Sequence, residues 1–178
     1  ESDLALFQAK KLGRNRIEFF TRQLQDDIQS KRRLAEELRL GLERREIVPY
    51  YQIQLDAKTR EIAGLEALAR WIHPEKGVLS PAVFLKVADE NGLAAEIDAA
   101  ILSRVLEDRL DWQAQGAVVP RVAVNISGPR LFDPGLLANL GALKIPPGAL
   151  SFELVETIFL DDSDDRLVAS IERIKQME

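Results

Sequence analysis

Residues 64–71 read Gly64-Leu65-Glu66-Ala67-Leu68-Ala69-Arg70-Trp71, a short apolar run that contains one carboxylate and one guanidinium. Charged side chains are rarely buried unless a partner or a metal ion compensates them. Two later apolar runs repeat this arrangement, because Asn125 lies late in residues 122–127 and Glu153 lies within residues 152–156. We therefore regard Glu66, Asn125 and Glu153 as candidate functional residues.

The run around Glu66 forms the second half of a predicted β-hairpin. Apolar and aromatic residues predict a first strand from Ile47 to Ile53, and a polar turn follows from Asp56 to Arg60. The second strand is predicted from Ile62 to Ala69. A connection this short joins antiparallel strands, because a parallel crossover needs a dozen residues or more.

After the hairpin, predicted helices and strands alternate. Ser80-Pro81 is typical of a helix start, with an N-cap followed by proline at the first helical position. We predict helices over 80–92, 94–115, 129–143 and 161–178, and strands over 118–126 and 150–155. This alternation indicates a parallel α/β sheet or barrel, in which sites form at the carboxyl ends of the strands. The three candidate residues all lie toward such ends in the predicted strands.

Residues 21–46 predict a long helix that precedes the hairpin. Positions 24, 28, 31, 35, 38 and 42 form an imperfect heptad seam. Two interpretations stay open, an amphipathic helix packed on its own domain and a dimeric coiled coil. Residues 1–20 are too few to bury a core and resemble the end of something larger.

Composition limits the classes of function. The chain has 178 residues, no cysteine and a net charge of −5, with +2 in residues 1–47 and −7 in the rest. Binding of duplex nucleic acid is therefore not indicated, whereas an acidic body suits divalent cations. We find no apolar run long enough for a membrane span and expect a soluble, cytoplasmic segment, although the parent protein could carry an anchor upstream.

The candidate residues supply hard oxygen ligands, which suit Mg²⁺, Mn²⁺ or Ca²⁺ rather than zinc. Such a cation could polarise a phosphoryl oxygen and lower the pKa of bound water. Arg70 could clamp a phosphate in a bidentate manner. The alternative is that Glu66 pairs with Arg70 or another arginine, and that Asn125 satisfies a buried backbone group.

A resemblance to a known family sharpens these expectations. The chain resembles an EAL domain over about residues 32–178, and the matching segments are Tyr50-Tyr51-Gln52, Gly64 to Trp71, His73-Pro74, Leu79-Ser80-Pro81 with Phe84, Val124 to Ser127 and Phe152 to Glu156. The resemblance implies hydrolysis of cyclic di-GMP to linear pGpG with Mg²⁺ or Mn²⁺. It also implies a modified (β/α)₈ barrel whose first strand is antiparallel, with residues 47–178 forming its first half.

The resemblance also assigns roles to residues. It implies that Glu66, Asn125 and Glu153 are metal ligands and that Gln52, Leu68 and Arg70 contact the substrate. It implies that Glu156 supports the active-site loop and is not a direct metal ligand. Strand geometry agrees, because Glu153 and Glu156 are three residues apart, point to opposite faces and should not share one metal ion. The chain departs from the family at Ile53, where proline is usual, and we expect this change to alter only the strand end. It also departs at Val155, where threonine is usual, so a hydroxyl that would support the site is lost.

Residues 3–16 resemble the closing segment of a GGDEF diguanylate cyclase domain, in which the positions of Lys10 and Arg14 contact nucleotide phosphates. The GGDEF signature is absent from this chain, so we expect a structural remnant, a linker helix at 21–46, and GGDEF and sensor domains upstream.

A complete barrel takes about 250 residues. We therefore expect the family's paired aspartates and catalytic lysine to follow Glu178, and the half barrel to pack against another chain as a homodimer. A catalytically inactive EAL domain, acting as a receptor for cyclic di-GMP or as a protein-interaction module, is the alternative function.

Three features are assigned no site role. Residues 161–165 are interpreted as a solvated helix start, His73 as part of a turn, and Trp71 and Trp112 as packing residues.

Overall fold

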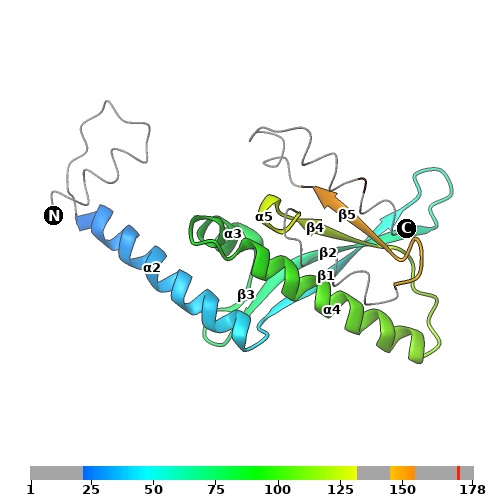
Figure 1. The fold of residues 1–178 in the computed structure, drawn as a ribbon, viewed down its shortest axis with the longest axis horizontal. Helices are drawn as coiled ribbons and strands as arrows, with labels where there is room; N and C mark the ends of the chain where they lie inside the picture. Colours follow the sequence, from blue (N-terminus) through cyan, green and yellow to red (C-terminus); the bar gives the residue numbers. More distant parts are fainter. Residues whose placement is uncertain (1–21, 132–144, 155–171, 173–178) are drawn as a thin grey trace.

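The computed structural model describes residues 22–131, 145–154 and 172 (Figure 1). Within these residues an open α/β sheet is flanked by helices. The elements in chain order are α2 (Arg22–Glu43), β1 (Ile47–Leu55), β2 (Ile62–His73), β3 (Gly77–Leu79), α3 (Pro81–Glu90), α4 (Ala94–Ala114), β4 (Val122–Ile126), α5 (Gly128–Leu131) and β5 (Leu150–Leu154). Predictions for residues 1–20, for most of the helices at 129–143 and 161–178, and for Val155 and Glu156 fall outside the described residues.

The predicted hairpin is confirmed. β1 and β2 pair antiparallel, with Gln52 opposite Glu66 and Tyr50 opposite Leu68. β2 is longer than predicted, because after Ala69 it continues to His73 and pairs with the short strand β3. Glu66 therefore lies near the middle of β2 rather than toward its end, which corrects the predicted placement.

Apart from the antiparallel pairs that β2 forms with β1 and β3, the sheet is parallel, as predicted. Its strand order is β1-β2-β4-β5, with β2 parallel to β4 and β4 parallel to β5. The predicted strand at 118–126 begins only at Val122, since the preceding segment runs through Pro120 and leaves Val118 exposed. This sheet, with its antiparallel first strand, confirms the predicted half-barrel fold class.

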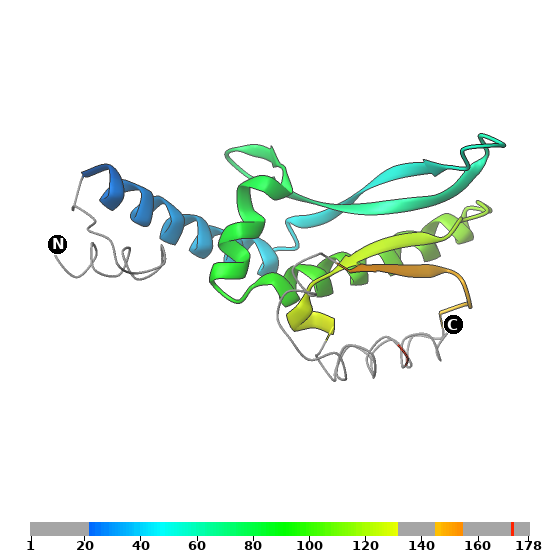
Figure 2. The same ribbon diagram turned by 90° about the horizontal axis from the view of Figure 1, so that it is seen from above.

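Helix α4 covers one face of the sheet and contacts β1, β2 and β4 (Figure 2). Odd-numbered residues of β1 and β2 face it, because strand side chains alternate between faces. The Tyr51 hydroxyl donates to Asp108 at 2.7 Å, and the Tyr51 ring meets Trp112 edge-on. On β4, the buried residues Val122 and Val124 join the same core.

Helix α2 is held by its carboxyl-terminal half, and its other end extends away from the sheet (Figure 1). Leu38 is fully buried, while Leu34 and Leu42 pack against the core. The heptad position Lys31 is exposed. The described helix therefore packs on its own domain through this half, as in the first of the two interpretations.

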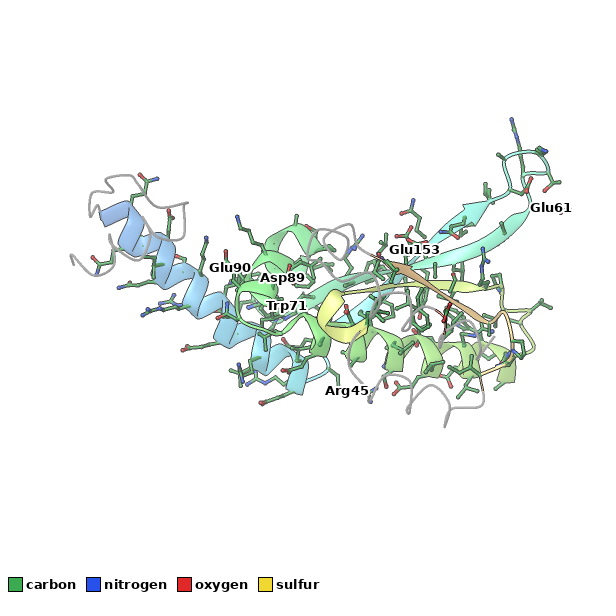
Figure 3. The ribbon with its side chains drawn as sticks, turned by 45° about the horizontal axis from the view of Figure 1, so that its top comes forward. Arg45, Glu61, Trp71, Asp89, Glu90 and Glu153 are labelled. Carbon is green, nitrogen blue, oxygen red and sulfur yellow. The ribbon has the colours of Figure 1, made fainter. Side chains whose placement is uncertain are left out.

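The two tryptophans are packing residues, as predicted. Trp71 is fully buried between α2, α3 and the sheet (Figure 3), and its indole meets Phe84 edge-on.

His73 differs from its prediction, because it ends β2 and is buried. Its Nδ1 accepts hydrogen bonds from the backbone N–H groups of Glu75 and Lys76, both at 3.1 Å, so it organises the turn to β3.

Candidate active site

The sheet face opposite α4 carries the predicted site residues. Gln52 and Glu66 lie directly across from one another on β1 and β2. Glu66 is in register with Ala123, two residues before Asn125, and Asn125 is in register with Glu153. Because cross-strand partners share a face and side chains alternate, these four side chains leave the same side of the sheet.

The register also sets how far apart the residues lie. Neighbouring strands are about 4.8 Å apart, so the backbones of Asn125 and Glu153 are close neighbours. The two-residue offset and the rise per residue place the Glu66 backbone roughly 8 Å from that of Asn125. Glu153 projects from β5 beside β4 (Figure 3). Three strands thus present one oxygen-bearing side chain each to a single area.

Glu66 and Glu153 have no hydrogen bond or ion pair with other described residues, although both are only partly exposed. The alternative pairing of Glu66 with Arg70 is not observed. Arg70 instead donates from Nη1 to the carbonyl of Ala69 at 2.8 Å. Asn125 likewise makes no side-chain hydrogen bond within the described part of the chain. Within the described residues, the side-chain oxygens of Glu66, Asn125 and Glu153 therefore accept no protein hydrogen bond.

The donor set suits a hard cation. Two carboxylates and one amide oxygen, none bound to described protein groups, are the ligand types that Mg²⁺ and Mn²⁺ take. No cluster of three or more His, Cys, Asp or Glu side chains able to hold a metal occurs among the residues placed in the structure. A site here would therefore depend on Asn125 as well as on the two glutamates.

The predicted substrate contacts share this face. Arg70 follows Glu66 by four residues on β2, and Leu68 lies between them, half-buried. Gln52 is exposed opposite Glu66. Glu156 lies outside the described residues. The structure thus brings together Gln52, Glu66, Leu68, Arg70, Asn125 and Glu153.

Two residues on this side were not predicted. Tyr50 has its ring centroid 5.6 Å from the guanidinium carbon of Arg70. The sequence could have indicated Tyr50, because it lies two residues before Gln52 and residues two apart on a strand share a face. Ser127 follows Asn125 by two residues, just beyond β4. Its buried Oγ has no hydrogen-bond partner among the described residues, while its N–H donates to Asp98 at 2.8 Å.

Contacts behind the sheet fix the strands that carry these residues. Burial and the Asp108 carboxylate raise the pKa of the Tyr51 phenol, so it stays a hydrogen-bond donor. Arg109 is buried and donates to the carbonyl of Pro120 at 2.6 Å, just before β4, and burial lowers the pKa of this guanidinium. Both contacts anchor a site strand to α4.

An α/β sheet that presents carboxylate and amide oxygens from neighbouring strands is typical of barrel enzymes that use a metal ion. Residues 35–178 match the family model described as the EAL domain. Because this match spans most of the sequence, the chain belongs to the EAL domain family.

Similar curated proteins and solved structures support this family assignment. The chain is 33% identical over 171 residues to the bifunctional diguanylate cyclase/cyclic di-GMP phosphodiesterase MucR of Pseudomonas aeruginosa, covering 94% of this chain and 25% of MucR. It is 33% identical over 168 residues to the cyclic di-GMP phosphodiesterase NbdA of the same organism, covering 87% and 22%. The structure of the PaMucR phosphodiesterase in complex with c-di-GMP superposes with a TM-score of 0.69 at 32% identity, covering 82% of this chain and 60% of that one.

The chain spans about a quarter of the length of these curated relatives. No described helix is both long and apolar enough to cross a membrane.

Proposed function

We propose that the EAL domain represented by this chain hydrolyses cyclic di-GMP to linear pGpG. The observation that carries the proposal is the shared face of Glu66, Asn125 and Glu153, with Gln52 and Arg70 beside them. The name of NbdA and the c-di-GMP complex of the MucR phosphodiesterase support it. The substrate is a cyclic dinucleotide with two phosphodiesters, so both an anion-binding group and a metal site are required.

We further propose that Glu66, Asn125 and Glu153 would hold Mg²⁺ or Mn²⁺. When bound, the cation supplies charge for the phosphoryl oxygens and a water molecule of lowered pKa. The chain's own contribution is positional, since three strands fix the ligands without flexible loops. Arg70 would bind a phosphate oxygen through its N–H donors, and Gln52 and Leu68 would contact the rest of the nucleotide. We infer from the family resemblance that Glu156 supports the active-site loop.

The test is conversion of cyclic di-GMP by the full-length protein with Mg²⁺ or Mn²⁺, followed by chromatography of the products. We expect pGpG from the wild type and a loss of at least about a hundredfold in Glu66→Ala, because a metal ligand is removed. Leu110→Ala, an exposed position on α4, is the matched control and should keep wild-type activity. Undiminished hydrolysis in Glu66→Ala would refute the role of Glu66. Binding of cyclic di-GMP by the wild type without any turnover would identify a receptor instead.

Several wider features of the parent protein remain proposals. We propose that residues 1–20 close a GGDEF domain and that α2 links it to the EAL domain, which the bifunctional name of MucR supports. We also propose a homodimer, to be checked by light scattering of the full-length protein. A cytoplasmic location stays a prediction, to be checked by cell fractionation.

A further inference from the structure

Arg70 is held by a ring and a carbonyl rather than by a carboxylate. Its guanidinium carbon lies 5.6 Å from the centroid of the Tyr50 ring, and its Nη1 donates to the carbonyl of Ala69 at 2.8 Å. No described Asp or Glu forms an ion pair with it. Among the described residues, the positive charge of Arg70 is therefore oriented but not neutralised by a carboxylate.

The β1–β2 register explains the contact. Tyr50 lies directly opposite Leu68, so Arg70 is its diagonal neighbour, and both side chains leave the face that carries Glu66. Aromatic and long side chains reach such diagonal neighbours on a sheet. Tyr50 is 46% exposed, so its ring is not required to fill the core. Its position is better explained by the guanidinium than by packing.

A ring orients a guanidinium in a way that preserves its use for an anion. Cation–π attraction acts between the positive charge and the face of the ring, and it requires no N–H donor to be given to a hydrogen-bond acceptor. A guanidinium has five N–H donors, and the Ala69 carbonyl occupies one nitrogen of the fork. A carboxylate partner would take two donors and cancel the charge. Arg70 thus keeps donors and charge for a phosphate.

We propose that Tyr50 is a positioning residue that holds Arg70 ready for a phosphate group of the substrate. The inference rests on the proposed function, since it assumes that this face binds a phosphodiester. Tyr50 acts through Arg70 and takes no part in bond breaking. Its loss should therefore weaken substrate binding more than it slows the chemical step.

Two substitutions in the full-length protein separate the ring from the hydroxyl. Tyr50→Leu removes the aromatic face, and we expect KM for cyclic di-GMP to rise about two- to fivefold, with kcat changing less. Tyr50→Phe keeps the face and should restore most of the affinity. Failure of Tyr50→Phe to restore it would overturn the proposal in favour of a role for the hydroxyl. An unchanged KM in Tyr50→Leu would overturn it as well.

A double-mutant cycle tests whether Tyr50 acts through Arg70. Binding of cyclic di-GMP is measured in EDTA, which stops metal-dependent turnover, for Tyr50→Leu, Arg70→Ala and the double variant. If Tyr50 works through Arg70, Tyr50→Leu should have no further effect once Arg70 is alanine. Additive losses would show that the ring contacts the ligand by itself and would overturn the proposal.

A measurement without ligand distinguishes failure of this inference from failure of the proposed function. The Nε–H resonance of Arg70 should carry a ring-current shift that disappears in Tyr50→Leu and persists in Tyr50→Phe. If the wild type neither binds nor hydrolyses cyclic di-GMP, the proposed function fails even where this shift is seen. If the wild type is active and the shift is insensitive to Tyr50→Leu, the positioning role fails alone.

Discussion

Gly41 of α2 packs against the indole of Trp71 on β2. A Cβ built on Gly41 would come within 2.8 Å of Trp71 Nε1 and 3.2 Å of its Cε2. Trp71 is fully buried, so its indole cannot move into solvent to make space for a larger residue. Helix α2 therefore approaches the site strand at a point where only glycine fits, one residue after Arg70.

Gly41→Ala is expected to destabilise the domain. Overpacking against a fixed ring costs about 1–3 kcal/mol, and the better helix propensity of alanine returns at most about 1 kcal/mol. We expect a lower melting temperature of the full-length protein by calorimetry. Ser30→Ala, an exposed change on the same helix, should leave it equal or slightly higher. A Gly41→Ala protein as stable as wild type would mean that α2 can shift without cost.

The indole of Trp71 is also held through its N–H, which donates to Glu46 Oε2 at 3.0 Å. Glu46→Leu should leave this buried donor unpaired, at a cost of about 1–3 kcal/mol. Glu46→Gln keeps an acceptor oxygen and should lose much less. Urea unfolding of the two variants measures the difference, and equal midpoints would show that water replaces the carboxylate.

Structural features set by neighbouring residues could be predicted from the sequence, whereas features set by contacts with a later segment could not. The short polar turn at 56–60 was enough to establish the hairpin, because chain geometry permits no other pairing. The extension of β2 to His73 was missed, since it depends on pairing with β3 beyond a turn that contains Pro74 and resembles a strand end.

The candidate site shows the same difference between features set by one segment and features set by the pairing of segments. Placement toward the carboxyl ends of predicted strands in a parallel sheet was sufficient to predict that Glu66, Asn125 and Glu153 belong to one site. The contact between Tyr50 and Arg70 was not predicted, because it requires the register between two strands as well as the alternation within each. The contact of Gly41 with Trp71 was not predicted either, because it depends on where helix α2 crosses the sheet.

Acidification is expected to weaken the attachment of α2. Glu37 of α2 accepts a hydrogen bond from Lys76 at 2.5 Å and lies 3.4 Å from Nε2 of His73. The Lys76 ammonium, chiefly, holds the pKa of Glu37 below its ordinary value of 4.5. Because the folded pKa is the lower one, this stabilisation is present above about pH 4.5 and is lost as pH falls through the folded value.

Glu37→Gln isolates that effect. The pair is partly exposed, so its contribution at neutral pH should be at most about 1 kcal/mol. The stability gap between wild type and Glu37→Gln should be present above about pH 4.5 and should close toward pH 3. Glu36→Gln, an exposed neighbour on α2, serves as the control. A gap that stays constant across this range would contradict an ionic origin.

Metal dependence should reveal the role of Asn125, the one neutral member of the proposed ligand set. Asn125→Leu is similar in volume but removes the oxygen donor, so the Mn²⁺ concentration for half-maximal hydrolysis should rise by at least about tenfold. Asn125→Asp keeps an oxygen and adds negative charge beside Glu153, its cross-strand neighbour. That variant should retain metal binding and need no more Mn²⁺ than Asn125→Leu.

To measure the Mn²⁺ requirement, the full-length protein is stripped with EDTA and titrated with Mn²⁺ at saturating cyclic di-GMP. A lowered kcat in Asn125→Leu with an unchanged Mn²⁺ requirement would show that Asn125 orients substrate or water and is not a ligand, leaving Glu66 and Glu153 to hold the cation.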